Sequence, residues 1–183
     1  MSETPAAPSP ADVVAFWREA GPKRWFEKDA GFDDDIRRRF LKAHEAAAGK
    51  LTDWEASAEG ALALLILLDQ FPRNMFRGQA RMFASDPLAH AIASRAILNG
   101  FDGAFFDLFR FFYLPFMHSE ELADQKRAIA FYRARNDADG LKWAKRHADI
   151  IRRFGRFPHR NAVLGRVSTP EEQAFLDGGG FAG

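Results

Sequence analysis

One long apolar stretch, residues 57–70, limits the folds that this chain can adopt. Its Ala, Leu and Ile side chains fall on every face of a helix rather than along a single stripe. A helix of this kind has no face suited to water, so the sequence predicts a buried central helix inside a larger helical assembly. The longest apolar run in it, 61–68, is far shorter than the roughly 20 residues that cross a bilayer, and we expect no membrane insertion.

Amphipathic helices are predicted on both sides of this stretch, and their ends carry capping signals. Ser9-Pro10 is typical of an N-cap followed by proline at the first helical position. The acidic run 33–35 suits the first turn of a helix that ends near Ala48, because a helix N-terminus favours negative charge. The other expected boundaries are a start at Asp86-Pro87, a start with Ser119 as N-cap, an end at Gly155 in a left-handed cap, and a capping box at Thr169-Pro170-Glu171-Glu172.

These signals predict an all-α, tetratricopeptide-like array of about eight antiparallel helices, while strand signals are nearly absent. At 183 residues the chain suits one helical domain, 11–183, after a flexible, Pro-rich tail, 1–10. The segment 101–116 holds seven phenylalanines but only one basic residue, Arg110. We interpret these rings as core, because a membrane-surface helix would carry Lys or Arg on its opposite face.

A peptide that occurs twice marks the candidate site. Phe71-Pro72-Arg73-Asn74 continues to Arg77-Gly78, and Phe157-Pro158-His159-Arg160-Asn161 continues to Gly165-Arg166. Each copy follows a predicted helix, which the proline is expected to stop. Because Arg and Asn side chains need partners wherever they are buried, we interpret the two copies as walls of one polar site. Its expected ligand-binding residues are Gln70, Arg73, Asn74, Arg77, Arg156, His159, Arg160 and Asn161.

Asp69 lies at the end of the apolar helix, beside Gln70. A carboxylate in that position needs a cation, which Arg73, Arg77 or an Arg of the second copy could supply. The pattern therefore favours an ion-paired hinge between helices, and the alternative is that Asp69 acts as a general base or contacts a ligand.

A third polar segment places His118, Glu120 and Asp124 close together in the sequence. An imidazole beside carboxylates could act as an acid/base pair or could bind a metal. Since no dense metal-ligand spacing is present, we expect neither a metal nor a cofactor, and we retain His118 as the second candidate base with Glu120 and Asp124 as ligand contacts. His159 lies between Arg156 and Arg160, which disfavour its charged form, so a neutral ring is expected.

Charge is distributed unevenly along the chain. Residues 126–166 contain twelve Lys or Arg against three Asp, a net charge of +9, whereas residues 1–60 contain nine bases and twelve acids, a net charge of −3. Either acidic N-terminal helices neutralise basic C-terminal ones, or the basic part binds an anion. The chain has no cysteine, which excludes thiolate chemistry and disulfides. No secretory signal is recognisable, so a cytoplasmic location is expected.

Several blocks of this sequence resemble a known family. They are Phe16-Trp17, Trp25-Phe26, Leu67-Leu68-Asp69-Gln70-Phe71-Pro72-Arg73-Asn74 with Arg77-Gly78, Tyr113-Leu114-Pro115-Phe116 with His118-Ser119-Glu120, and Arg153-Phe154-Gly155-Arg156-Phe157-Pro158-His159-Arg160-Asn161 with Leu164-Gly165-Arg166. Over nearly the whole chain after the tail, the sequence resembles a bacterial family known only as domain of unknown function 924. The resemblance implies a tetratricopeptide-like fold and supplies no activity, so it identifies no catalytic residue.

Three functions are compatible with these patterns. The first is a binding module whose Arg-rich groove holds an acidic peptide or a small carboxylate or phosphate compound. The second is a small-molecule enzyme, a hydrolase or isomerase of an anionic substrate, with Asp69 or His118 as general base. The third is nucleic-acid binding through the basic residues 126–166, which is less favoured because few Trp and Tyr are present there to stack on bases. The sequence predicts no oligomeric state.

Overall fold

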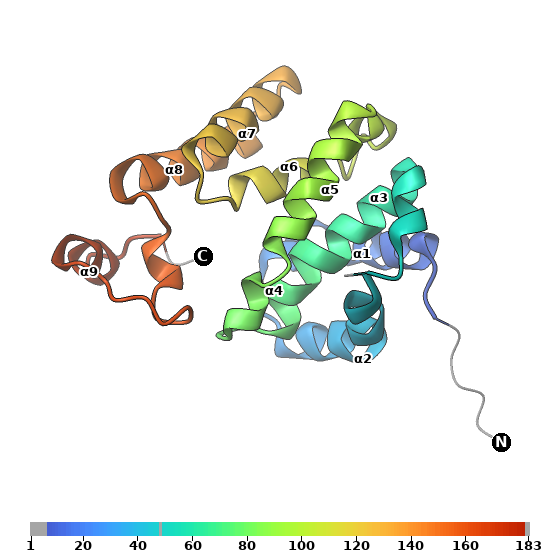
Figure 1. Cartoon of the computed structure of the whole chain (residues 1–183), viewed down its shortest axis with the longest axis horizontal. Helices are drawn as coiled ribbons and strands as arrows, with labels where there is room; N and C mark the ends of the chain where they lie inside the picture. The colour runs from blue at the N-terminus through green and yellow to red at the C-terminus, as the bar shows by residue number, and fades with distance from the viewer. Residues whose placement is uncertain (1–6, 48, 182–183) are drawn as a thin grey trace. The chain divides into compact units, whose positions relative to one another are not determined.

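The structure is a computed structural model that describes residues 7–47 and 49–181 (Figure 1). Within these residues all regular secondary structure is helical, and eight α-helices have eight residues or more, which confirms the predicted all-α fold. These helices are α1 (Pro10–Phe26), α2 (Ala30–Ala47), α3 (Ala58–Leu65), α5 (Asp86–Leu98), α6 (Arg110–Met117), α7 (Leu122–Ala134), α8 (Ala138–Phe154) and α9 (Pro170–Asp177). The predicted tail, 1–10, lies partly outside the described residues.

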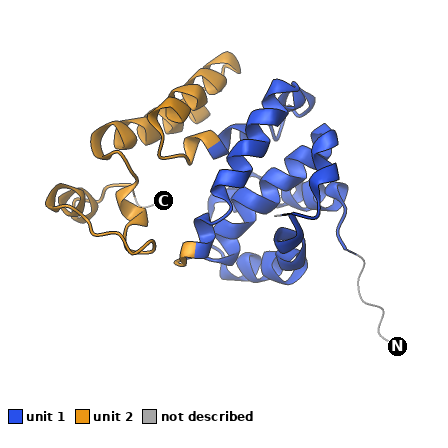
Figure 2. Ribbon diagram, in the orientation of Figure 1, with its two compact units in different colours: residues 1–77, 81–115 blue, residues 78–80, 116–183 orange. Residues whose placement is uncertain are grey.

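The chain forms two compact units, which are coloured separately in Figure 2. Unit 1 comprises residues 1–77 and 81–115, and unit 2 comprises residues 78–80 and 116–183. Helices α1 to α5 belong almost entirely to unit 1, and α7, α8 and α9 belong to unit 2. Each unit is described by itself. No helix of the described residues is long and apolar enough to span a lipid bilayer.

The predicted central helix is the core of unit 1. Helix α3 continues into a π-helical turn (η2, Ile66–Gln70) and then into the short helix α4 (Phe71–Met75), and every residue of 60–72 is buried. Helices α1 and α5 pack against α3, while α2 packs against the π-turn and α4. A helix that is apolar on all faces is therefore covered on all faces, as its sequence requires.

Pro72 was expected to stop this helix, and that prediction is wrong. The backbone of Gln70 and Phe71 stays in the helical region, and α4 continues to Met75. The π-turn accommodates the proline, because the Phe71 N–H bonds to the carbonyl of Ile66, one residue further back than in an α-helix. Pro72 has no N–H to donate, so the carbonyls of Leu67 and Leu68 lose their helical partners.

Two side chains from other segments donate to these two carbonyls. His44 of α2 contacts the Leu67 carbonyl through Nδ1 at 2.9 Å, and the Ser85 hydroxyl donates to the Leu68 carbonyl at 2.6 Å. Since a carbonyl only accepts, His44 carries its proton on Nδ1. Burial lowers the pKa of His44, which keeps the ring neutral. The proline is thus tolerated because α2 and the segment before α5 replace the missing backbone bonds.

Some predicted helix starts are confirmed and others are wrong. As expected, Ser9 is the N-cap of α1, Thr169 forms a capping box, and Gly155 ends α8 in a left-handed conformation; Ser9 also forms a capping box with Asp12, which was not predicted. Helix α7, however, begins at Leu122, and Ser119 is not its N-cap. The Ser119 hydroxyl accepts from the Glu121 N–H at 3.1 Å and donates to Asp124 at 2.8 Å, so it stabilises the turn before the helix.

Helix α2 starts earlier than the acidic run suggested. It begins at Ala30 after Asp29, whose carboxylate accepts from the Phe32 N–H, so only Asp33 of the acidic run falls in the first turn.

The phenylalanines of 101–116 are not all core. Phe111, Phe112 and Phe116 are buried, as predicted, but Phe106 is 93% exposed. Periodicity alone could not separate Phe106 from the buried rings.

Unit 2 is built on the packed pair α7 and α8, which the three residues 135–137 connect. The close approach occurs at Gly140, which is buried against the ring of Tyr132. Ala144 and Ala148 continue the buried stripe of α8, and Ile150, Ile151 and Phe157 form a core cluster against which α9 packs Phe175.

We expect Gly140→Ala to destabilise the protein, since an added Cβ would lie 2.5 Å from Tyr132 Cε1 and 2.7 Å from Asp137 Oδ2. Overpacking of this kind costs about 1–3 kcal/mol, which should be visible as a lower urea midpoint. Gly103→Ala is the control, because nothing lies within 4 Å of a Cβ there. Equal stability of the two variants would contradict the close packing of α7 and α8.

Candidate functional site

The first copy of the repeated peptide is held within unit 1 by ion pairs. Arg73 donates to both carboxylate oxygens of Asp86 at 2.9 Å and lies 3.2 Å from Asp69 Oδ1. Asp69 is only 1% exposed, and Gln70 donates to it. These contacts correspond to the ion-paired hinge that the sequence favours for Asp69. Arg73 thereby joins the π-turn to the start of α5.

Asn74 and Arg77 of the same copy converge on one carboxylate. Asn74 Nδ2 donates to Asp33 Oδ1 at 2.7 Å, while Arg77 donates to Oδ2 at 2.5 Å and to Oδ1 at 3.1 Å. Asp33 lies on α2 and is buried. A buried carboxylate needs charged or amide donors, and the peptide supplies both types. This joint fixes α4 to α2.

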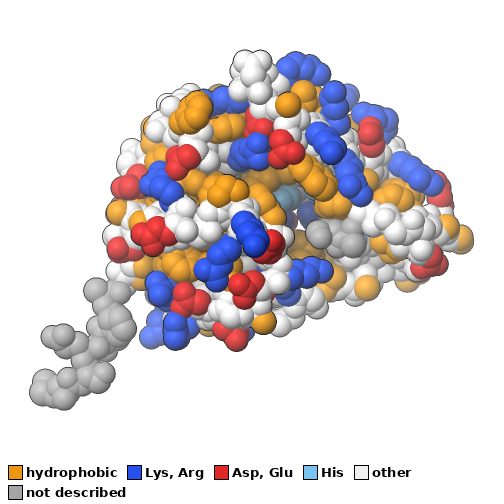
Figure 3. Space-filling model, turned by 180° about the vertical axis from the view of Figure 1, so that it is seen from behind, with side chains coloured by type: hydrophobic (Ala, Val, Ile, Leu, Met, Phe, Trp, Pro, Cys, Tyr) orange, Lys and Arg blue, Asp and Glu red, His pale blue; other side chains and the backbone are white. Residues whose placement is uncertain are grey.

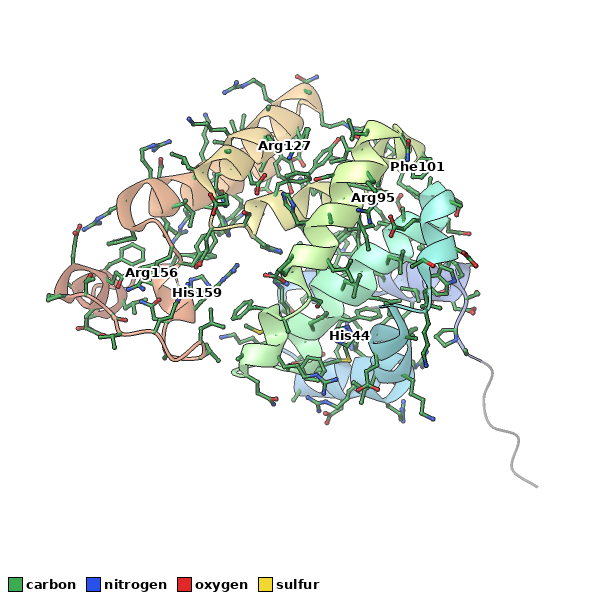
Figure 4. The ribbon with its side chains drawn as sticks, in the orientation of Figure 1. His44, Arg95, Phe101, Arg127, Arg156 and His159 are labelled. Carbon is green, nitrogen blue, oxygen red and sulfur yellow. The ribbon has the colours of Figure 1, made fainter. Side chains whose placement is uncertain are left out.

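The second copy takes part in a similar joint in unit 2, together with Arg156, which directly precedes it and is labelled in Figure 4. Arg156 donates to the two carboxylate oxygens of Glu172 at 2.6 and 2.7 Å, and Asn161 Nδ2 donates to the same carboxylate at 3.2 Å. Glu172 is 2% exposed. The hydrogen bonds from Arg156, joined by the Thr169 N–H of the capping box, lower the pKa of Glu172 to about 2. In each unit, therefore, the Asn of the repeated peptide shares one buried carboxylate with an Arg, which is Arg77 inside the first copy and Arg156 directly before the second.

The third polar segment and the second copy come together in unit 2. Glu120 accepts from Arg166 at 2.7 and 3.0 Å and from the Phe157 N–H at 2.8 Å. Although burial opposes it, these donors lower the pKa of Glu120. Asp124 accepts from Ser119, and its carboxylate lies 3.5 Å from Arg127. Glu120 and Asp124 thus have structural partners inside the unit.

A cluster of aromatic and imidazole rings surrounds Phe157, whose N–H donates to Glu120. The ring centroids of His147 and His159 are each 5.6 Å from that of Phe157, and Phe181 lies 4.6 Å from His147 and 5.2 Å from His159. The Arg160 guanidinium lies 4.5 Å from the centre of the Phe157 ring.

Both imidazoles of this cluster are neutral at pH 7. Burial, together with the positive charge of Arg160, lowers the pKa of His147 to about 4 and that of His159 to about 3. The neutral ring expected for His159 is thereby supported. His118 is near enough to act on both pKa values. His147 Nδ1 donates to the Trp143 carbonyl at 2.9 Å, which places the lone pair of the neutral ring on Nε2.

A basic groove that the motif analysis missed runs along α8. It has a volume of about 620 Å³, and its walls come from α8, α9 and the segment after α9. On the face shown in Figure 3, Lys and Arg side chains gather over the α7–α8 part of unit 2. The lining residues include four cations, one acid and several apolar side chains: Lys142, Lys145, Arg146, Arg153, Asp149, Leu141, Ile150, Phe154, Phe175 and Phe181.

Three of these cations differ from Arg73, Arg77 and Arg156, each of which pairs with a carboxylate. Within the described residues, Lys142, Lys145 and Arg146 form no ion pair, whereas Arg153 pairs with Glu171 at 2.9 Å. The Arg146 guanidinium stacks over the rings of Trp143 and Phe181 instead. The groove therefore keeps uncompensated positive charge beside an aromatic wall. The only sequence signal for it was the +9 excess of residues 126–166, which does not identify individual residues.

The sequence-predicted site residues are thus located, and most have internal partners. The set Asp69, Gln70, Arg73, Asn74 and Arg77 lies in unit 1, and the set His118, Glu120, Asp124, Arg156, His159, Arg160 and Asn161 lies in unit 2. Whether these residues contact a ligand or act in catalysis stays a prediction. In the described part of the chain, no group of three or more His, Asp or Glu is arranged to hold a metal ion.

Comparison with known proteins gives a family and a fold. The family model described as a bacterial protein of unknown function, DUF924, matches residues 13–180. A solved structure of a protein of unknown function from Agrobacterium tumefaciens is similar at 51% identity and a TM-score of 0.89, covering 92% of this chain and 97% of that one. No curated protein matches the chain.

The Arg156–Glu172 joint predicts a contrast between two neighbouring acids. We expect Glu172→Gln to lower the free energy of unfolding by about 1–3 kcal/mol at pH 7, because buried donors lose a charged acceptor. Glu171→Gln breaks an exposed pair and should cost less than about 1 kcal/mol. Urea denaturation measures both. Because the folded pKa of Glu172 is low, its contribution is complete above about pH 4.3 and is lost as pH falls toward 2.

The neutral imidazoles predict a second pH dependence. An unfolded histidine titrates near pH 6.5, whereas His147 and His159 in the folded protein titrate at about 4 and 3. Their contribution is therefore complete above pH 6.5 and is lost as pH falls through these folded values. We expect His159→Phe to make the fall in unfolding free energy between pH 6 and 4 shallower by about 1.4 kcal/mol per pH unit. An unchanged slope would show that His159 titrates normally.

Proposed function

Because the chain belongs to the DUF924 family of bacterial proteins, which brings no activity with it, we propose a function from the chemistry of unit 2: the protein is a binding module that holds an acidic peptide in the α8 groove. The observation that carries this proposal is a set of three cations that form no ion pair among the described residues, Lys142, Lys145 and Arg146, beside an apolar wall. Such a site attracts carboxylates and buries the apolar parts of a peptide.

The length of the groove favours an extended ligand. Lys142, Lys145 and Arg146 lie on one face of α8 within about 6 Å along the helix axis. The groove continues along α8 from Ala138 to Phe154, about 24 Å at a rise of 1.5 Å per residue. About seven residues of an extended peptide can fill this length while their carboxylates meet the three cations.

The finer expectations from the sequence belong to this proposal. A tetratricopeptide-like repeat would suit peptide binding, and the packed α7–α8 pair, with Gly140 against Tyr132, supports one such unit. A cytoplasmic location would bring the groove into contact with other soluble proteins.

A small-molecule enzyme with His118 as general base is the second candidate. The observation that favours it is that His118 lies near His147 and His159, which gives a general base there two neutral imidazoles as neighbours.

The proposal is tested by fluorescence anisotropy with a labelled octaglutamate peptide. We expect Lys145→Glu to weaken binding about fivefold at low salt, because one charge in the groove is reversed. Lys126→Glu is the matched control, since it makes the same change at an exposed position of α7. Equal losses in both variants would mean that only net charge matters. Binding of a labelled oligo(dT) that matches or exceeds the peptide would favour nucleic acid instead.

A further inference from the structure

The aromatic ring of Phe181 lies at the end of the α8 groove. It occupies a site formed by His147, Phe157 and His159, which we call the seat. Phe181 packs edge-on against two rings, with angles of 66° to His147 and 84° to His159. Phe157 lies behind both imidazoles, and Phe181 also packs against its core cluster with Ile150 and Ile151. Edge-to-face contacts with rings of this kind are specific for another aromatic side chain.

This seat opens into the groove, because Gly180 and Phe181 are themselves part of its lining. Arg146 lies next to the seat, with its guanidinium 5.5 Å from the centre of the Phe181 ring. A carboxylate adjacent to a ring placed here would meet a cation that has no ion pair in the described chain. The two chemical features of the groove, aromatic packing and positive charge, therefore meet at one point.

The segment that carries Phe181 is lightly attached. It follows Gly178, Gly179 and Gly180, and Gly179 has a φ of +76°. The Gly180 N–H bonds to the Phe175 carbonyl at 2.9 Å. Phe181 itself is only partly buried, unlike Phe157, which is fully buried. Gly180 packs closely against Phe175, whereas nothing lies within 4 Å of a Cβ at Gly179, so the backbone freedom of this run lies before Gly180.

We propose that the seat formed by His147, Phe157 and His159 is the specificity pocket of the groove, that it accepts an aromatic residue of an acidic peptide, and that Phe181 occupies it as an internal competitor. This inference rests on the proposed function, since it concerns the same groove. The neutral state of His147 and His159 supports it, because uncharged rings can bury an aromatic side chain without a desolvation penalty for charge.

The experiment compares two labelled peptides by fluorescence anisotropy. One has seven glutamates and one central phenylalanine, and in the other alanine replaces the phenylalanine. We expect Phe181→Ala to bind the phenylalanine peptide about tenfold more tightly than the wild type does, since the competitor is gone. Its affinity for the alanine peptide should change by less than about twofold. Phe106→Ala is the control, because that ring is 93% exposed in unit 1.

A second readout follows the seat directly. The phenylalanine peptide should shift the imidazole NMR signals of His147 and His159 in Phe181→Ala, and the alanine peptide should not. The inference is overturned if Phe181→Ala changes both affinities equally, or if neither peptide moves the histidine signals. Binding of both peptides without discrimination would leave the groove as an anion site and remove only the aromatic pocket. Failure of both peptides to bind either protein would overturn the proposed function as well.

Discussion

A buried carboxylate that requires hydrogen-bond donors stabilises each of the two units of this protein. Asp33 and Glu172 are shielded from water, and an ionised group in that position is tolerated only if donors surround it. Both receive a guanidinium and a side-chain amide, from Arg77 and Asn74 of the first copy in one unit, and from Asn161 of the second copy and Arg156 just before it in the other. The asparagine of the repeated peptide thus donates to a buried carboxylate in both units, although the arginine beside it comes from different positions.

The sequence alone predicted the fold class correctly. It failed where side chains from distant segments donate hydrogen bonds to the backbone and so allow a helix to continue. Helix periodicity and capping residues predicted the buried central helix, the N-cap at Ser9 and the capping box at Thr169, because these depend on neighbours in the chain. Pro72 was misjudged because the donors that make it tolerable, His44 and Ser85, come from segments that no local pattern connects to it. Ser119 was misjudged for a local reason, since its hydroxyl accepts from the Glu121 N–H and donates to Asp124, so that it stabilises the turn before the helix.

The candidate site shows the same division. Residue types indicated that Arg73, Asn74 and Arg77 need partners, and the partners exist, but the sequence could not say that Asp86 and Asp33 would supply them. The net charge of +9 in residues 126–166 correctly indicated a basic region, but it did not show which of these cations line the groove. Which cations keep their charge uncompensated depends on where the acids of α9 and of the turn before α7 lie, which is a property of the tertiary structure.

This difference in partners decides where an anion can bind. To reach Arg73, a ligand carboxylate would have to displace Asp86, which would leave that acid partly buried without its bidentate partner. Breaking one side of a buried pair typically costs about 3–5 kcal/mol, more than one new contact returns. Lys142 and Lys145 are exposed, and in the part of the chain that the structure describes they have no ion pair to break. The arginines that the sequence makes conspicuous are thus the costly ones to use, and the less conspicuous cations of α8 are the ones on which a ligand can gain energy.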